Sequence, residues 1–173
     1  MKPKTVGRIG GDNPQARIYA PYAFRDTGLL QGTTILTLEG EMPAESLSVG
    51  DKVITRDSGT ARVEYIQRTT RMVHTIAVAA GSLGDTRPKR DAILAADQMC
   101  LIRDWRAQAM FNADRALVAA RTLVDGEFIR DLGMQERTLI QIFCDGPHIL
   151  YSEGLEISTA DGAHARGQVL HAA

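Results

Sequence analysis

Short apolar runs separated by turn residues constrain the fold of this chain more than any other feature. From Thr33 onward these runs recur about every ten positions, which is the texture of an all-β protein. Within residues 60–67, the apolar side chains Ala61, Val63 and Tyr65 occupy every second position, as in a half-buried strand. The sequence therefore predicts an all-β architecture.

The positions of the expected strands follow from these runs. We place strands at residues 33–38, 52–55, 60–67, 74–78, 92–95, 99–102, 138–143 and 148–151. The last two are expected to pair around a turn at residues 145–147, Asp-Gly-Pro. Helix is expected to be scarce. We predict one helical turn at residues 43–47 and one short helix within residues 113–124.

The length of the chain fits one domain with an extension at each end. A chain of 173 residues, 44% hydrophobic and 24% charged, has an ordinary globular composition and enough apolar residues for one core. Residues 1–27 contain glycine and proline without a sustained period, so we expect an N-terminal arm there. After Ser158 the composition turns small and polar, and residues 159–173 are expected to form a C-terminal tail. The predicted domain spans residues 28–158.

The charge balance gives no electrostatic case for a nucleic-acid partner. Lysine and arginine total 20 against 21 aspartates and glutamates, which gives a net charge of −1. No apolar run reaches the roughly 18 residues that span a bilayer, so membrane insertion is not expected. The N-terminal sequence has no apolar region like that of a signal peptide. A cytoplasmic location is the default expectation, and export without an N-terminal signal stays open.

We expect neither a cofactor nor a metal site. The two cysteines, Cys100 and Cys144, fit no zinc motif and no disulfide framework, and both are interpreted as small buried hydrophobic residues. The chain has neither a phosphate-binding glycine loop nor a cluster of metal ligands. A conventional metabolic enzyme is therefore without support.

An ordered set of residues near the start of the predicted domain, and an apolar strand with a glycine turn near its end, form a recognisable pattern. They are Gly32-Thr33, Gly40, Pro43, Glu45, Leu47, Gly50-Asp51, Val53 and Thr55, followed later by residues 148–155. The pattern resembles that of hedgehog/intein (Hint) domains of the stand-alone bacterial type, over roughly residues 28–158. The resemblance implies a mainly antiparallel β fold with one or two short helices, in which long strands exchange between two pseudo-symmetric halves.

The resemblance also implies a self-cleavage reaction. In Hint domains a thiol or hydroxyl on the first residue attacks the preceding carbonyl, and a histidine in a Thr/Ser-x-x-His segment protonates the departing amide nitrogen. Gly28 stands four residues before Gly32, where such domains carry cysteine. Residues 96–99, Ala-Asp-Gln-Met, correspond to the histidine segment. We therefore expect Gly28, Ala96 and Met99 to be vestigial catalytic positions without the nucleophile, the hydroxyl and the imidazole.

Three further residues are candidates for a catalytic role. Asp97 carries a carboxylate for acid–base chemistry, although a turn residue that closes two strands is the ordinary explanation. Cys100 is a candidate for a displaced nucleophile, but its apolar run favours packing, because burial raises the pKa of a thiol. His148 is interpreted either as the remnant of a proton-transfer site or, more simply, as a structural histidine.

Two functions follow from these assignments. The first is a Hint-like domain that has lost self-cleavage and acts as a structural or binding module, for a protein partner that the sequence does not identify. The alternative is a slow autoproteolytic domain that cleaves its own chain near residue 28 with an unorthodox nucleophile. Losing a general acid costs about 10²- to 10⁴-fold in rate, whereas losing the nucleophile removes the covalent intermediate. The glycine at position 28 therefore favours the first function.

Overall fold

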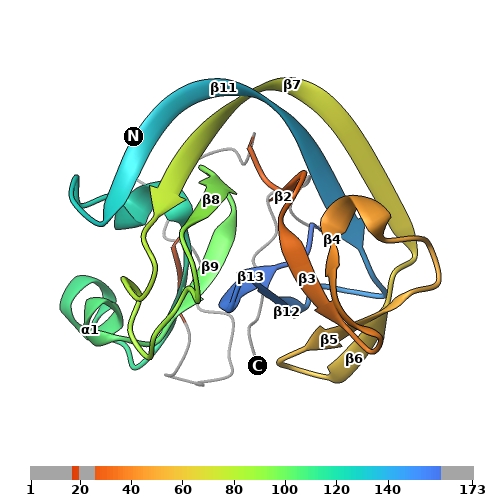
Figure 1. Ribbon diagram of the computed structural model, residues 1–173. Coiled ribbons are helices and arrows are strands. Elements are labelled where there is room, and N and C mark those ends of the chain that lie inside the picture. Colours follow the sequence, from red (N-terminus) through yellow and green to blue (C-terminus); the bar gives the residue numbers. More distant parts are fainter. Residues whose placement is uncertain (1–16, 20–25, 161–173) are drawn as a thin grey trace, which may run out of the picture.

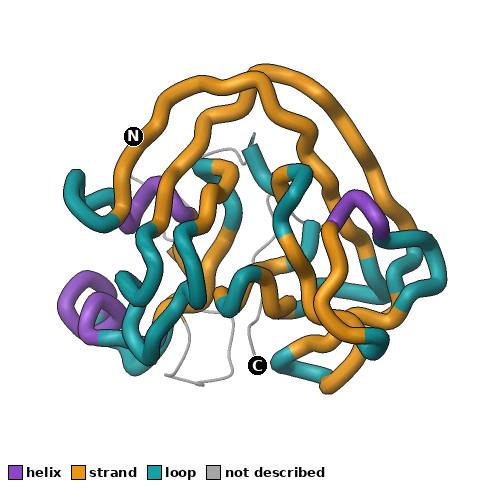
Figure 2. The backbone as a smooth tube through the Cα atoms, in the orientation of Figure 1, coloured by secondary structure: helices purple, strands orange, loops and turns teal. Residues whose placement is uncertain are grey.

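Strands dominate the computed structural model, which describes residues 17–19 and 26–160. Figure 1 shows two long strands that arch over two smaller lobes lying side by side. The strands form one sheet of nine and one of four, and most neighbours run antiparallel. The scarcity of helix is plain in Figure 2. The prediction of a mainly antiparallel all-β fold is confirmed.

The arch consists of β7 (Tyr65–Val78) and β11 (Ile129–Phe143), which pair antiparallel over their length. On the far side of β7 lies β8 (Ala92–Ala95), and on the far side of β11 lies β2 (Leu29–Leu30). The four-stranded sheet therefore has the order β2-β11-β7-β8. These are the long exchanging strands that the family resemblance implies.

The strands expected at residues 60–67 and 74–78 are not separate units. A short strand, β6 (Gly59–Arg62), ends early, and β7 then runs without a break as far as Val78. Residues 67–72 are exposed or half-buried in this strand. Because neither face of the strand is buried there, no alternation of apolar residues marks it in the sequence.

The larger sheet supplies most strands of both lobes. Its order is β1-β10-β9-β13-β12-β3-β5-β6, with β4 paired to β3. The bounds are β1 (Arg17–Tyr19), β3 (Thr34–Thr37), β4 (Gly40–Pro43), β5 (Lys52–Thr55), β9 (Met99–Ile102), β10 (Ala116–Ala119), β12 (Ile149–Ser152) and β13 (Leu155–Ser158). The β12–β13 hairpin lies between the lobe of β3 to β6 and the lobe of β8 to β10 (Figure 1).

The pairing expected between residues 138–143 and 148–151 is wrong. β11 has β7 and β2 as its neighbours, whereas β12 pairs with β13, β3 and β5. The turn at residues 145–147 therefore leads the chain out of the arch and into the larger sheet. A local turn signal does not reveal that the strand before it is already paired with residues far away in the sequence.

The helix predicted within residues 113–124 is also wrong. This region forms β10 and a 3₁₀ turn, η2 (Ala120–Leu123). Every residue of β10 is buried, and the strand lies between β9 and β1. A short apolar run that is buried on both faces cannot be assigned to strand or helix by periodicity alone.

The one α-helix of the described residues is α1 (Trp105–Phe111). The Asp104 side chain caps its start by accepting a hydrogen bond from the Arg106 N–H at 3.1 Å, and Asn112 ends it in the left-handed conformation. The helical turn expected at residues 43–47 is confirmed by the 3₁₀ turn η1 (Ala44–Ser46). The total agrees with the expectation of one or two short helices.

The main hydrophobic cluster of the described residues extends through both lobes and under the arch. Among its fully buried members are Ile35, Val53, Ile76, Val118, Ile140, Leu150 and Ile157. Each such side chain contributes about 1.5–3 kcal/mol when it leaves water. Cys100 lies in this core as expected, and Cys144 is half-buried and packs against it.

The expected arm and tail lie largely outside the described residues. Residues 1–16 and 20–25 of the arm, and residues 161–173 of the tail, are not described. The three residues of β1 pair in parallel with β10. Within the described part of the chain, no helix is long and apolar enough to cross a membrane. The domain bounds of 28–158 stay a prediction.

Candidate functional site

Residues 26–28 lie against the turn that joins β8 to β9. The backbone N–H of Asp26 donates to Asp97 Oδ2, and the N–H of Asp97 donates to the Asp26 carbonyl oxygen, both at 3.0 Å. The N–H of Gly28 donates to Gln98 Oε1, also at 3.0 Å. Figure 1 shows β2, which starts at the next residue, beneath the arch and facing β8. The fold thus brings Gly28 to residues 96–99, the segment that we expect to correspond to the histidine motif.

The backbone at position 28 disfavours any side chain. Gly28 has a φ angle of +128°, which residues with a Cβ rarely adopt. A Cβ at this position would lie 3.0 Å from Gln141 Cγ and 3.2 Å from the carbonyl oxygen of Ile140. A flexible side chain and a strand backbone would both have to move. The absence of a nucleophile is therefore matched by the local conformation.

Side-chain amides hold both polar atoms of the Thr27–Gly28 peptide bond. Gln141 Nε2 donates to the Thr27 carbonyl oxygen at 3.1 Å and lies 3.3 Å from Thr27 Oγ1. Gln98 Oε1 accepts a hydrogen bond from the Gly28 N–H, which is the nitrogen of the same peptide bond. Neither glutamine stands out in the sequence as a site residue. The one sequence feature that could have indicated a role for Gln141 is that it is the polar residue within the apolar run 139–143.

The orientation of the Gln98 amide is fixed by its remaining contacts. Its Nε2 donates to the carbonyl oxygens of Met99 at 3.2 Å and Ser158 at 2.9 Å. The oxygen is therefore the atom that faces Gly28, because a reversed amide would lose these bonds and oppose two donors. Gln98 accepts a hydrogen bond from the Gly28 nitrogen and has no acidic proton to give to it.

Met99 lies in a different environment from Gln98. It is fully buried in a cluster with Leu101, Leu117, Ala119 and Ile149. Met99 is the first residue of β9, where successive side chains point to opposite faces. The side chain beside the Gly28 nitrogen therefore belongs to Gln98, one position before the residue that we expect to replace the histidine.

Asp97 is buried, and both of its carboxylate oxygens are engaged. Oδ1 pairs with Arg121 Nη2 at 2.7 Å, and Oδ2 accepts from the Asp26 N–H. Asp26 is buried too. Its Oδ1 accepts from Arg71 Nη1 at 2.6 Å, and its Oδ2 from the His74 N–H at 3.1 Å. These contacts favour a role for Asp97 in holding the turn and the arm together rather than in proton transfer.

Cys100 and Ala96 contribute no reactive group. Burial raises the pKa of the Cys100 thiol to about 12, so almost no thiolate exists at neutral pH. Its Sγ lies 3.6 Å from the Gln98 carbonyl oxygen. Ala96 acts through its backbone, since its N–H donates to the His74 carbonyl at 2.8 Å and its carbonyl accepts from the Arg121 N–H at 2.9 Å. The packing interpretation of Cys100 is favoured.

His148 belongs to a separate cluster before β12. Its Nδ1 lies 2.7 Å from Asp57 Oδ2, and its Nε2 lies 2.8 Å from Asp145 Oδ1. Burial lowers the pKa of His148, but the hydrogen bonds and charges of Asp145 and Asp57 together outweigh this, so the pKa lies above its usual value. These contacts favour the interpretation as a structural histidine.

The raised pKa of His148 makes its protonated form stabilising. That contribution is fully present below the unfolded pKa of about 6.5 and is lost as the pH rises through the higher folded pKa. We expect His148→Asn to lower the free energy of unfolding more at about pH 5.5 than at about pH 8.5. Urea unfolding of both proteins at the two pH values measures the difference. Equal losses at both would contradict this assignment.

Comparison with known proteins agrees with the fold. A family model described as the Hint domain matches residues 27–162. The structure is similar to the bacterial intein-like domain from Clostridium thermocellum, with a TM-score of 0.53 and 15% identity over 77% of this chain and 97% of that one. It is also similar to the DnaB intein from Synechocystis sp. PCC 6803, with a TM-score of 0.53 and 13% identity over 77% and 99%.

At these identities the structural likeness establishes the fold alone, and no curated protein matches the chain. The family model, in contrast, covers well over half of the sequence and includes the arch, both lobes and the Thr27–Gly28 junction. The chain therefore belongs to the Hint domain family.

Proposed function

We propose that this Hint domain does not cleave its own backbone and serves as a structural or binding module that keeps the residues before Gly28 attached. The observation that carries the proposal is the glycine at position 28, which offers no nucleophile; its φ of +128°, and the 3.0 Å that would separate an added Cβ from Gln141 Cγ, disfavour any side chain there. The argument has three steps, which concern the nucleophile, the departing nitrogen and the bound arm.

The Thr27–Gly28 bond has no route to an ester intermediate. Self-cleavage of the Hint type needs a nucleophile on the residue after the bond that breaks, and Gly28 offers none. Thr27 carries a hydroxyl, but on the acyl side of the bond, where attack on its own carbonyl would close a strained four-membered ring. Cleavage at this bond therefore lacks its first step.

The nitrogen of the same bond also lacks an acid. A departing amide nitrogen must gain a proton, because an unprotonated amine anion is a very poor leaving group. The group that faces this nitrogen is Gln98 Oε1, which accepts the Gly28 proton. Hydrogen bonds from Gln98 Nε2 to the carbonyls of Met99 and Ser158 oppose any rotation of the amide.

The same contacts support a binding role for the junction. The Asp26 N–H, the Asp26 carbonyl, the Thr27 carbonyl and the Gly28 N–H each have a hydrogen-bond partner in the domain. We call residues 26–28, with Asp97, Gln98 and Gln141, the clasp. Beside a nucleophile, these hydrogen bonds would hold the peptide for catalysis. Here, where no nucleophile is present, they anchor the N-terminal arm.

Intact mass spectrometry tests the proposal directly. The purified chain is incubated for a day with and without thiol and hydroxylamine, which release a thioester or ester as two fragments. We expect the full-length mass to persist under all conditions. Fragments divided between residues 27 and 28 would show that another nucleophile acts and would overturn the proposal.

The alternative, slow autoproteolysis near residue 28, has a distinct signature. Thr27 Oγ1 has a feasible five-membered path only to the carbonyl of Asp26, so hydroxylamine would divide the chain between residues 26 and 27. Thr27→Ala is the matched control, because it removes this hydroxyl alone. Such fragments in the wild type but not in Thr27→Ala would establish the alternative. Intact masses for both proteins support the non-cleaving domain.

A further inference from the structure

Three arginines converge on one buried glutamate at the centre of the larger sheet. The Glu156 side chain in β13 is 3% exposed. Its Oε1 accepts from Arg56 Nη1 at 2.9 Å and Arg103 Nη2 at 3.1 Å, and its Oε2 from Arg103 Nε at 3.0 Å and Arg87 Nη1 at 3.3 Å. We call these four residues the arginine cluster.

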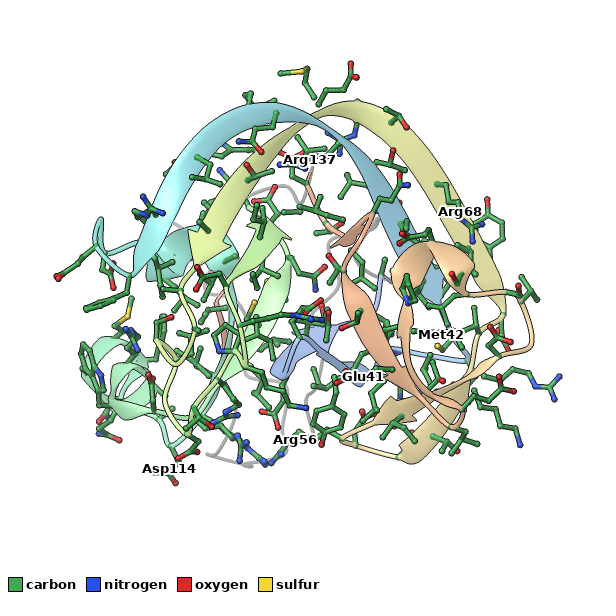
Figure 3. All side chains as sticks on the ribbon, in the orientation of Figure 1. Glu41, Met42, Arg56, Arg68, Asp114 and Arg137 are labelled. Atoms are coloured by element: carbon green, nitrogen blue, oxygen red, sulfur yellow. The ribbon has the colours of Figure 1, made fainter. Side chains whose placement is uncertain are left out.

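The arginine cluster joins the two lobes. Arg56 follows β5 in one lobe, whereas Arg103 follows β9 in the other, and Arg87 lies in the loop between β7 and β8. Figure 3 shows Arg56 at the lower middle of the molecule, with Glu41 above it. The cluster therefore lies where both lobes meet the central hairpin.

Positive charge exceeds negative charge in this cluster. The other carboxylate in contact is Asp85, which pairs with Arg87 Nη2 at 3.0 Å but is itself 83% exposed. Three guanidinium groups thus share two carboxylates. The Arg56 guanidinium has no further hydrogen-bond partner among the residues that the structure describes, and the buried Nε of Arg87 has none either. Like charges held this close favour an additional anion.

A groove of about 290 Å³ lies beside the arginine cluster. Of the arginine cluster, Arg87 lines it, together with Lys89 and Tyr151 and with the carboxylates of Glu41, Asp85 and Glu153. Tyr151 is the cross-strand partner of Glu156, so both side chains lie on the same face of the hairpin. The Thr34 and Thr86 hydroxyls of the groove already donate to Glu153 Oε1 and to the Asp85 carbonyl oxygen. The groove therefore offers the Tyr151 hydroxyl next to the surplus positive charge of the arginine cluster.

The acidic residues of the groove are already paired. Glu153 Oε1 accepts from the Thr34 N–H at 2.8 Å, and its Oε2 pairs with Arg90. Glu41 pairs with Lys89 Nζ at 3.4 Å. These pairs leave the excess charge of the arginine cluster uncompensated.

We propose that the arginine cluster and its groove bind a phosphate group, either as free phosphate or as a small phosphomonoester. Guanidinium forks match the geometry of such an oxyanion and bind it through short, charge-assisted hydrogen bonds. A groove of about 290 Å³ suits a compact ligand rather than a large one. This binding is independent of the proposed loss of self-cleavage, because it uses none of the residues of the clasp.

Calorimetric titration with inorganic phosphate, at ionic strength matched with chloride, tests the proposal. We expect saturable binding, and we expect Arg56→Gln to raise the phosphate Kd by about tenfold or more, because one charge-assisted hydrogen bond is lost. Arg130→Gln is the matched control, since it removes the same charge from an exposed position of β11. Its Kd should equal that of the wild type.

Glu156→Gln provides a second readout with the opposite sign. Removing the internal carboxylate raises the positive charge of the site, so phosphate should bind this variant several-fold more tightly than the wild type. A second titration with phosphoserine distinguishes free phosphate from a phosphomonoester. The compound with the lower Kd is the kind of ligand that the site prefers. Heat that does not saturate, or an equal Kd in Arg56→Gln and Arg130→Gln, would overturn the proposal.

Discussion

Replacing Glu156 by glutamine is expected to lower the free energy of unfolding by about 3 kcal/mol. The carboxylate accepts four hydrogen bonds from Arg56, Arg87 and Arg103. Glutamine keeps the shape, but it removes the counter-charge that three cations share and turns an N–H₂ group toward a guanidinium. This expected loss of stability is at the lower end of the range for a broken buried ion pair. The reason is that the arginine side chains are 15–35% exposed, so water partly screens their charges.

Urea unfolding measures this loss, and Glu136→Gln is its control. Glu136 is exposed on β11, so the same chemical change there should alter the free energy of unfolding by no more than about 0.5 kcal/mol. Equal losses for the two variants would show that the arginine cluster does not stabilise the contact between the lobes.

Gln98→Leu is expected to cost about 3 kcal/mol of stability. The substitution leaves the Gly28 N–H and the carbonyls of Met99 and Ser158 without their side-chain partner in the interior. A buried polar group without a partner costs about 1–3 kcal/mol, and partial relaxation keeps the total below three full penalties. Because Gln98 is part of the clasp, the loss should fall on the attachment of the arm.

Urea unfolding and amide hydrogen exchange together check this prediction. Gln67→Leu makes the same change at an exposed position of β7 and should leave stability nearly unchanged. In Gln98→Leu the Gly28 amide should exchange much faster, since it loses its acceptor. A Gly28 amide that stays as protected as in the wild type would refute the clasp as described.

Features that depend on a few neighbouring residues were predictable from the sequence. The strands expected at residues 52–55, 92–95 and 99–102 coincide with β5, β8 and β9. Their apolar runs are short, buried and bounded by turn residues, which is a local pattern. The lack of a nucleophile at Gly28 is equally local, because it concerns the identity of one residue.

Features that depend on contacts between distant residues were decided by the tertiary structure. The continuity of β7 across the arch has no apolar period in the sequence, since its middle residues face water on both sides. The partners of β12 depend on strands that lie elsewhere in the chain.

The chemistry of the Thr27–Gly28 junction was also determined partly by the sequence and partly by the tertiary structure. The sequence by itself determined that no thiol follows the Thr27 carbonyl. Only the fold decided that Gln98 rather than Met99 faces the Gly28 nitrogen, and that Gln141 reaches the Thr27 carbonyl across a sequence separation of 114 residues. The physical reason is that hydrogen bonds require atoms within about 3 Å of each other, and proximity between distant segments arises only when the sheets have assembled.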